Sequence, residues 1–399
     1  MKQRIVMKGL CSHPSCRLPA IAICGLALTL SACLEPQVAP DLPAISSPQF
    51  QIETLADGLE YPWAVEVSND DQYFITGNRG QLWQIEDGVT TLHDGLVTAL
   101  DDLARDKTMT QGQGGLLDVA IAPDFAMSGD LYISYSYGAW DSNGTALSRV
   151  SLNENAIADV TSVFKVPFAK EAGSHFGGRI AFLEDGSLIL TTGDGFALRE
   201  EAQKVTSHLG KIVRLNRDGS VPDNNPAFGD GAVPGLYSIG HRNIQGLAYD
   251  AVTGNLWANE HGPRGGDELN LIRPGQNYGW PIVTKGLDYQ GAKISPAESL
   301  PDYVDPVHGW TPSIAPSGLA IYRGDLFPQY KGLALIGGLA SGDVRMVNTD
   351  TGEEIRLLDD LKTETDKFRV RDVKVDNDGA ILVLVEDPDN GRLLRLTPK

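Results

Sequence analysis

The sequence predicts an all-β protein, a six-bladed β-propeller built from four-stranded antiparallel blades. Three observations lead to this prediction. From residue 50 onward the chain repeats one unit six times, in which short apolar strands alternate with turns containing Asp-Gly, Thr-Gly-Asn or Asn-Asp-Gly. Glycine and proline are frequent, with 44 and 23 residues, and follow no collagen-like period. Long helical periodicity is absent, and only a short stretch such as 197–207 reads as helical.

Each of the six repeats predicts one blade, in chain order. Their first residues are Trp63, Gly114, Gly177, Ile244, Ser317 and Arg369. A single four-stranded sheet cannot bury both of its faces, whereas six sheets arranged radially bury them against one another. A pair of β-sandwiches would not account for the repeat. We expect the sixth blade to close with a strand from residues 50–55. We also expect four tryptophans to pack between blades, namely Trp63, Trp83, Trp257 and Trp280.

The N-terminus has the features of a targeting segment. Basic residues precede the apolar run 20–30, which is too short to span a bilayer and ends in Leu-Ser-Ala-Cys. This resembles a bacterial lipobox, so we expect residues 1–32 to be a lipoprotein signal peptide and Cys33 to be lipidated; a plain cleaved signal is the alternative. The residue after Cys33 is Leu34 and not Asp, which favours sorting of the lipoprotein to the outer membrane. Residues 33–49, rich in Pro, Ala and Ser, read as a flexible tether, and residues 50–399 as the propeller domain.

Charge and cysteine content limit the partners. Without residues 1–32 the chain keeps 29 basic against 52 acidic residues, a net charge of −23. Such a surface repels nucleic acid and anionic lipid, so we expect no nucleic-acid partner and membrane contact only through the lipid anchor. The predicted location is the periplasmic side of the cell envelope. The three other cysteines leave with the signal, so the mature fold has no disulfide.

Five polar motifs lie where repeats begin or end. QGQGG opens the second repeat, SHFGGR precedes the third, GHRNIQG opens the fourth, NEHGPRGGDE closes the fourth, and RVRD opens the sixth. Equivalent positions in successive blades of a propeller face the same end of the molecule. We therefore expect these motifs to converge at one mouth of the central channel.

The residue types in these motifs suit one kind of ligand. His175 is a base near neutral pH, and three arginines offer planar guanidinium groups that fit carboxylates, namely Arg242, Arg369 and Arg371. Gln113 and Asn243 add amide groups. Backbone carbonyls of Gly262 and Pro263 are hard oxygen ligands that suit Ca²⁺. Together they describe a pocket for an oxygen-rich anionic ligand.

The motifs resemble those of the soluble quinoprotein aldose dehydrogenases of the glucose/sorbosone dehydrogenase family. QGQGGLLDVAIAPDF, HFGGR, HRNIQG, NEHGPRGGDELN, NYGWP and RVRDV occur in that order, and the resemblance covers residues 58–398. It implies a six-bladed propeller that holds pyrroloquinoline quinone and Ca²⁺. It implies oxidation of the anomeric hydroxyl of aldose sugars to lactones by hydride transfer, with electrons passing to an unidentified acceptor.

The resemblance also implies roles for the cofactor-side residues. His175 would be the general base on the sugar hydroxyl, and Arg242 with Asn243 would bracket the quinone oxygens. Gln113, Arg369 and Arg371 would hold the carboxylates and edge of the cofactor.

For calcium, the resemblance implies two sites. The carbonyls of Gly262 and Pro263 would bind the catalytic Ca²⁺, and Glu268 with the carbonyl of Tyr278 would hold a structural one. Tyr289 resembles an aromatic residue that packs near the cofactor.

The sequence departs from the family pattern at two positions and leaves alternatives open. Ala340 stands where the family often has a lysine, and Ser174 where some relatives have a carboxylate. A calcium-dependent propeller lactonase would use side-chain Glu, Asn and Asp ligands and no basic pocket; a non-catalytic envelope binding propeller is the third hypothesis. The sugar, and the choice between monomer and homodimer, stay open.

Overall fold

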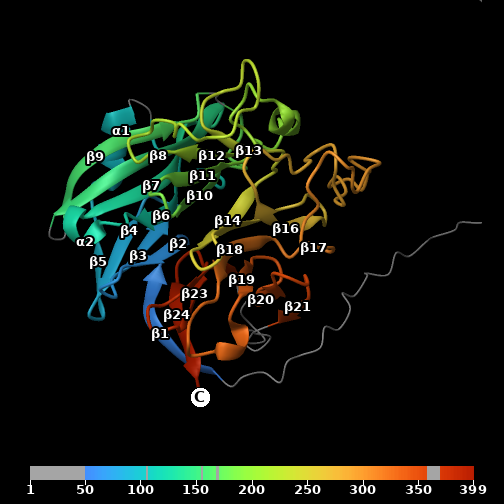
Figure 1. Cartoon of the computed structure of the whole chain (residues 1–399). Coiled ribbons are helices and arrows are strands. Elements are labelled where there is room, and N and C mark those ends of the chain that lie inside the picture. Colours follow the sequence, from blue (N-terminus) through green and yellow to red (C-terminus); the bar gives the residue numbers. More distant parts are fainter. Residues whose placement is uncertain (1–49, 105–106, 154–155, 168–169, 357–368) are drawn as a thin grey trace, which may run out of the picture. The chain divides into compact units, whose positions relative to one another are not determined.

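The computed structural model confirms the predicted propeller (Figure 1). It describes residues 50–104, 107–153, 156–167, 170–356 and 369–399, which belong to one compact unit. Within these residues the strands form six four-stranded antiparallel sheets. The predicted signal peptide, the lipidation residue Cys33 and the tether lie outside the described residues.

Each blade takes its strands from consecutive segments, apart from the last. Blade 1 consists of β2 (Pro62–Val67), β3 (Tyr73–Gly77), β4 (Leu82–Glu86) and β5 (Val89–Leu92). Blade 2 consists of β6 (Leu116–Ile121), β7 (Asp130–Ala139), β8 (Ser142–Asn153) and β9 (Ala156–Lys165). Blade 3 consists of β10 (Gly177–Phe182), β11 (Leu188–Thr192), β12 (Lys211–Leu215) and β13 (Leu236–Ile239).

The remaining blades follow the same order. Blade 4 consists of β14 (Ile244–Asp250), β15 (Asn255–Glu260), β16 (Asp267–Ile272) and β17 (His308–Trp310). Blade 5 consists of β18 (Pro316–Ile321), β19 (Leu333–Gly338), β20 (Val344–Asn348) and β21 (Glu354–Arg356). Blade 6 consists of β22 (Val370–Val375), β23 (Ile381–Val385), β24 (Gly391–Pro398) and β1 (Phe50–Leu59).

The ring closes by joining the two ends of the domain, as expected. Strand β1 pairs antiparallel with β24, from Phe50 opposite Pro398 to Leu59 opposite Gly391. The innermost strands β2, β6, β10, β14, β18 and β22 each contact the next, and β22 contacts β2 again. Each predicted repeat therefore begins at, or within two residues of, an innermost strand. The motifs that precede these strands are brought to the same end of the channel.

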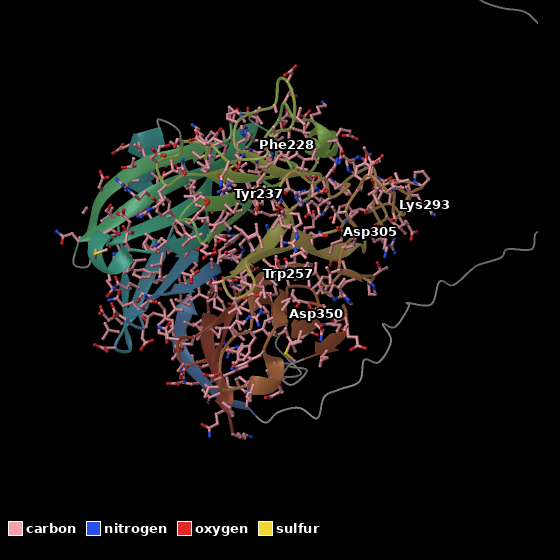
Figure 2. All side chains as sticks on the ribbon, in the orientation of Figure 1. Phe228, Tyr237, Trp257, Lys293, Asp305 and Asp350 are labelled. Carbon is pink, nitrogen blue, oxygen red and sulfur yellow. The ribbon has the colours of Figure 1, made fainter. Side chains whose placement is uncertain are left out.

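Hydrophobic packing lies between the blades. The buried apolar residues form six clusters, and each cluster joins two neighbouring blades. Trp83 packs between blades 1 and 6, and Trp257, labelled in Figure 2, packs between blades 4 and 5, as predicted. Because each blade buries both faces against its neighbours, the repeat becomes stable only as a closed ring.

Helices are few and short among the described residues. Residues 199–203, inside the stretch expected to be helical, form a 3₁₀ turn, and a second one covers Pro328–Tyr330. Two α-helices were not predicted, α1 (Leu96–Ala104) and α2 (Phe125–Ser128). Among residues 96–103 of helix α1, only Leu96 and Leu100 are buried, too few positions to give a clear helical period. No helix in the described part of the chain has the length and apolar character needed to cross a bilayer.

Candidate active site

A cavity of about 290 Å³ lies on the propeller axis, at the end where the motifs converge. Four of the predicted site residues line it, namely Gln113, Asn243, Arg369 and Arg371. Its other walls include an aromatic ring, an amide and a carboxylate that the sequence analysis had not assigned to the site, namely Trp63, Gln245 and Glu386. The lining thus combines cations, amides and aromatic surface, as expected for a planar anionic ligand.

The two predicted amide residues are oriented by backbone donors. The Gln113 Oε1 atom accepts the N–H of His175 at 2.9 Å, and the Asn243 Oδ1 atom accepts the N–H of Gly177 at 3.2 Å. These bonds tie blade 2 to blade 3 and blade 3 to blade 4. Because the amide oxygens are engaged, the amide nitrogens are the atoms left to donate to a ligand in the cavity.

Arg371 is a buried cation with little compensation. Its Nε atom lies 3.4 Å from Glu386 Oε2 and has no hydrogen-bond partner, and its guanidinium lies 4.8 Å from the centre of the Trp63 ring. Burial lowers the pKa of Arg371 to about 10, and Glu386 opposes that shift. A buried guanidinium with unused donor capacity favours an incoming anion.

Arg369 lies at the rim of the same cavity, beside Ala340. The Arg369 Nε atom donates to Glu386 Oε1 at 2.9 Å, and Nη1 reaches the Leu339 carbonyl at 3.5 Å. Leu339 lines the cavity and directly precedes Ala340. A guanidinium therefore stands next to the position where the family often has a lysine.

His175 forms a buried pair with a carboxylate that the sequence analysis missed. The His175 Nδ1 atom lies 2.6 Å from Asp194 Oδ1, and Asp194 Oδ2 accepts the indole N–H of Trp280 at 2.8 Å. The N–H of Phe196 donates to Asp194 Oδ1 at 2.8 Å, and the Phe196 ring packs edge-on against the imidazole. Trp280, from the β16–β17 connection of blade 4, thus reaches Asp194 of blade 3 and belongs to the site, a role that the sequence analysis did not give it.

Electrostatics keep this histidine neutral and its partner ionised. Burial lowers the pKa of His175, and the hydrogen bond to Asp194 only partly offsets that shift. Burial acts to raise the pKa of Asp194, but the His175 hydrogen bond and other contacts lower it on balance. An ionised Asp194 accepts the proton on Nδ1, so the lone pair of His175 is on Nε2, which is the form of a general base.

Arg242 is fixed beside this pair by contacts with blade 4 and the β16–β17 connection. Its Nη1 atom donates to the carbonyls of His261 at 3.0 Å and Gly262 at 2.9 Å, and Nη2 donates to the Tyr289 hydroxyl at 3.2 Å. The Arg242 carbonyl accepts the N–H of Asp194 at 2.8 Å. Arg242 and Tyr289 therefore adjoin the His175 pair, although they do not line the cavity itself.

The carbonyls expected to bind the catalytic calcium lie on the same turn. The Gly262 carbonyl accepts a hydrogen bond from the Arg242 guanidinium, and the Gly262 N–H donates to Asp267 Oδ1 at 2.8 Å. This carbonyl thus faces a cation, which fits the ligand type expected for Ca²⁺. Pro263 follows it in the chain, and its ring packs against Gly286.

Glu268 and Tyr278, the residues expected to bind a structural calcium, are connected indirectly, through Glu260 and His241. Glu268 is paired in register with Glu260 across strands β15 and β16, and the Asn270 amide nitrogen lies 3.2 Å from Glu268 and 3.3 Å from Glu260. Burial and the Glu260 carboxylate raise the pKa of Glu268. The Tyr278 ring stacks on His241, whose Nδ1 bonds Glu260. A buried carboxylate, Glu260, facing a partly buried one, Glu268, fits a bound cation.

The described residues, those around Gly262 and Glu268 included, hold no group of three or more His, Cys, Asp or Glu side chains arranged for a metal. The sequence could have pointed to Asp194, because TTGDG places a carboxylate two residues after the end of strand β11, at the end where the motifs converge. Trp280 lies in the NYGWP motif, but nothing in that motif indicates a partner for His175, and no local pattern marks Phe196.

Comparisons with known proteins show which family the chain belongs to. The model of the family described as Glucose / Sorbosone dehydrogenase matches residues 59–395. Aldose sugar dehydrogenase YliI of Escherichia coli is 38% identical over 358 residues, which cover 87% of this chain and 93% of that protein. These matches span nearly the whole propeller.

Solved structures similar to this chain include aldose sugar dehydrogenases. The apo form of the soluble aldose sugar dehydrogenase of Escherichia coli superposes with a TM-score of 0.80 and 35% identity, covering 88% of this chain and all of that one. The PQQ-bound aldose sugar dehydrogenase of Streptomyces coelicolor superposes with a TM-score of 0.69 and 25% identity, over 88% of this chain and all of that one. The chain belongs to the glucose/sorbosone dehydrogenase family and is a relative of its aldose sugar dehydrogenases.

Proposed function

We propose that this protein oxidises the anomeric hydroxyl of aldose sugars to lactones, using pyrroloquinoline quinone bound in the axial cavity. The observation that carries the proposal is a neutral imidazole, oriented by an ionised carboxylate, next to a cavity with an under-compensated guanidinium. The known relative from Streptomyces coelicolor that was solved in its PQQ-bound form supports the choice of cofactor.

The cavity residues would bind the negatively charged carboxylates of the cofactor and the face of its planar ring system. Arg371 and Arg369 would pair with its carboxylates, and the amide nitrogens of Gln113 and Asn243 would donate to its edge. The Trp63 ring would give the planar rings an aromatic wall. When bound, the quinone supplies the two-electron acceptor to which the sugar's anomeric carbon gives its hydride.

Proton removal belongs to the protein. The Nε2 atom of His175 takes the proton of the anomeric hydroxyl, so that the sugar loses one proton and one hydride and becomes the lactone. Asp194 holds Nδ1–H and stabilises the imidazolium that forms, and Trp280 holds Asp194. Arg242 lies close enough to stabilise negative charge that develops beside the imidazole.

Calcium would be held by the carbonyls of Gly262 and Pro263, with Glu268 and the carbonyl of Tyr278 as the structural site. The support is chemical, because the Gly262 carbonyl already faces a cation and Glu268 faces Glu260. A calcium-dependent lactonase has less support, since Asp118 and Asp372 on the channel axis are paired with Arg179.

Reconstitution tests the proposal. Purified apo-protein is mixed with the quinone and Ca²⁺, and dye reduction is followed with a panel of aldoses. We expect turnover that needs both additions and that falls about 10²-fold or more in His175→Ala. Folded protein that shows no turnover, or that hydrolyses lactones without quinone, would refute it.

We also propose that the protein is a lipoprotein of the cell envelope. The motif at residues 30–33 and the charged, apolar segment before it support this. Mass spectrometry of the mature N-terminus would show a diacylated or triacylated Cys33. A Cys33→Ala variant released without lipid but otherwise processed identically would indicate an ordinary secretory signal.

A further inference from the structure

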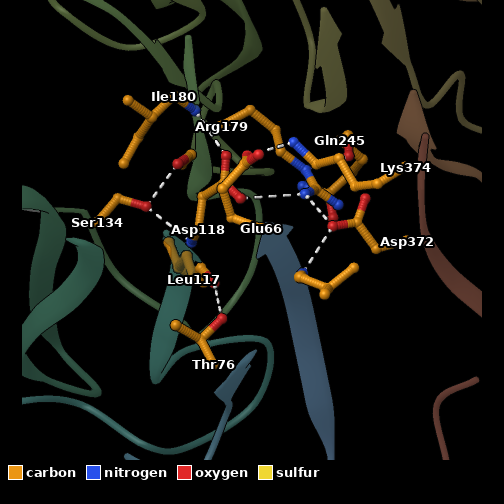
Figure 3. Close-up of polar contacts among 12 residues, drawn as sticks. Glu66, Thr76, Leu117, Asp118, Ser134, Arg179, Ile180, Gln245, Asp372 and Lys374 are labelled. Carbon is orange, nitrogen blue, oxygen red and sulfur yellow. Dashed lines mark hydrogen bonds and ion pairs between the residues drawn. The ribbon is translucent and has the colours of Figure 1, made fainter. Parts of the chain in front are cut away.

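A buried ionic cluster of Arg179, Asp118 and Asp372 joins three innermost strands (Figure 3). The Arg179 Nη1 atom lies 3.2 Å from Asp118 and 3.1 Å from Asp372. The three side chains come from strands β10, β6 and β22, and each residue is at most 3% exposed. None of them lines the cavity, and the proposed reaction gives them no role.

Arg179 contacts the cavity wall at three points. Its Nε atom donates to the Gln245 carbonyl at 2.6 Å, its Nη2 atom lies 3.4 Å from the Arg371 carbonyl, and its guanidinium lies 4.3 Å from the centre of the Trp63 ring. Gln245, Arg371 and Trp63 all line the cavity. One side chain thus connects the cavity-facing residues of blades 1, 4 and 6.

The carboxylates around Arg179 fix the backbone of the same strands. Asp372 Oδ2 accepts the N–H of Val65 at 3.0 Å, two residues from Trp63. Asp118 Oδ2 accepts the N–H of Ile180 at 2.7 Å. The cluster therefore joins innermost strands as well as side chains, and a shift of Arg179 moves the strands that present Trp63 and Arg371.

The two arginines near Trp63, Arg179 and Arg371, differ in how many carboxylates compensate their charge. Two carboxylates compensate Arg179, whereas among the described residues Arg371 has an ion pair only with Glu386, at 3.4 Å, and its Nε atom has no hydrogen-bond partner. Both guanidiniums lie within 5 Å of the same ring centre, at 4.3 and 4.8 Å. Arg179, whose charge is neutralised by the two carboxylates, supports the cavity wall. Arg371, which is less compensated, can pair with an anionic ligand.

The cluster also separates two cavities. Along β22 the order is Arg371, Asp372 and Lys374, where Arg371 lines the first cavity and Lys374 lines a second one of about 310 Å³. Lys374 is bonded to Glu66 at 2.6 Å in that second cavity. The Arg179 cluster therefore lies at the closed end of the first cavity.

We propose that Arg179 is a positioning residue for cofactor binding, which holds Trp63 and Arg371 as the closed end of the cavity. The inference rests on the proposed function for the identity of the ligand. It does not depend on that function for the geometry, because Arg179 contacts Trp63 and Arg371 in the protein alone. Its test therefore has one arm with the quinone and one without it.

The test uses a charge-balanced variant and a matched control. Arg179→Gln with Asp118→Asn removes one buried cation and one buried anion. The control, Arg345→Gln with Asp343→Asn, removes a similar pair in blade 5, where the Nε–Oδ2 distance is 2.9 Å and both residues are buried. Neither control residue lines the cavity. Chemical unfolding and circular dichroism measure what each double variant costs in stability.

In the first arm the dissociation constant for the quinone is measured with Ca²⁺ by absorption titration. We expect a rise of at least tenfold in the Arg179 double variant and less than threefold in the control. Equal constants for parent and Arg179 variant would overturn the inference. If the double variant does not fold, Arg179→Lys keeps the charge but lacks the planar fork, so we expect the same tenfold rise; parent-like binding by this folded variant would be equally contradictory.

The second arm needs no quinone. Acrylamide quenching of tryptophan fluorescence is compared with and without Trp63→Phe, so that the Trp63 contribution is obtained by difference. We expect this contribution to become at least twice as quenchable when Arg179 is replaced, and to stay unchanged in the control. An unchanged contribution would overturn the inference. A parent that binds no quinone would refute the proposed function, and this arm would still decide the role of Arg179.

Discussion

His175 has a left-handed backbone, with φ of +55°, which a residue with a side chain seldom adopts. Such a conformation costs about 1–3 kcal/mol and persists only where neighbouring contacts hold it. The Gln113 side chain accepts its N–H, and Asp194 holds its ring. A Cβ at Gly193 would lie 2.1 Å from the His175 carbonyl, so only glycine fits there. These contacts fix His175, which does not itself line the cavity but directly precedes two residues that do, Phe176 and Gly177.

Replacing Asp194 by asparagine tests the role of the carboxylate. Asp194 raises the pKa of His175 against the effect of burial, so its loss moves that pKa further down. The rate rises with pH as the imidazole loses its proton, so the acid limb of the kcat/KM profile should move to lower pH in Asp194→Asn. The plateau should fall by about 10²-fold, since the weaker base is also poorly oriented.

The pH profile distinguishes this role from a structural one. Glu200→Gln is a suitable control, because its carboxylate is exposed and close in sequence but bonds only Arg199. An unshifted acid limb in Asp194→Asn, or an equal shift in the control, would contradict the assignment.

Glu268 allows a second test at the residue scale. If Glu268 holds a cation, Ca²⁺ should raise the unfolding temperature of the parent, and a chelator should lower it again. Glu268→Gln removes the charge but keeps the size, so its unfolding temperature should no longer respond to Ca²⁺. A Ca²⁺ response that persists in this variant would place the structural metal elsewhere.

At the scale of elements, loops between strands build the site and Asp267 fixes two of them. Its Oδ1 atom accepts the Gly262 N–H at 2.8 Å, and its Oδ2 atom accepts Ser313 Oγ at 2.7 Å and the N–H groups of Ile314 at 2.8 Å and Ala315 at 3.0 Å. Ala315 lines the cavity. One carboxylate at the start of β16 therefore joins the Gly262 turn to the segment that leads into blade 5.

Truncation of Asp267 to alanine should weaken both stability and ligand binding. Four donors lose their acceptor in a buried place, so we expect the free energy of unfolding to fall by about 3 kcal/mol. Asp302→Ala, in an exposed position of the β16–β17 connection, should change it by less than about 0.5 kcal/mol. Urea unfolding of both variants measures the difference. Similar losses of unfolding free energy would show that the hydrogen bonds of Asp267 do not stabilise the fold.

The elements also show what sequence reasoning reaches and what it does not. The period of the repeats predicted the six blades and the closing strand, because strand alternation and turn residues are local signals. Motif position predicted that His175, Arg242 and Arg371 would gather at one end. Asp194 and Trp280 were missed as partners of His175, since loops of two different blades bring them together and no spacing within either loop reveals it.

At the scale of the whole molecule, the ring depends on one non-local pairing. Residues 50–54 of β1 pair with residues 394–398 of β24, and the Phe50 ring packs edge-on against Phe327 of blade 5. Without this strand, β24 would be an exposed edge in an otherwise closed structure. The mature chain, by the sequence analysis, has no disulfide to replace the lost connection.

Deletion of the closing strand should therefore affect the entire propeller. A chain that begins at residue 56 should unfold at lower urea concentration than one that begins at residue 49, with a loss of about 3 kcal/mol or more from the missing ladder and packing. It should also aggregate more readily through the free β24 edge. Equal midpoints for the two truncated chains would show that the ring is stable without β1.

The most direct test of the central claim, that the axial cavity is a quinone site served by His175, is one titration. Apo-protein with Ca²⁺ receives increasing quinone while the absorption spectrum is recorded, and glucose is then added to the parent and to His175→Ala. We predict saturable, stoichiometric binding by both proteins and rapid spectral reduction by glucose in the parent alone. Folded parent protein that fails to bind the quinone, or His175→Ala that is reduced as fast as the parent, would contradict the claim.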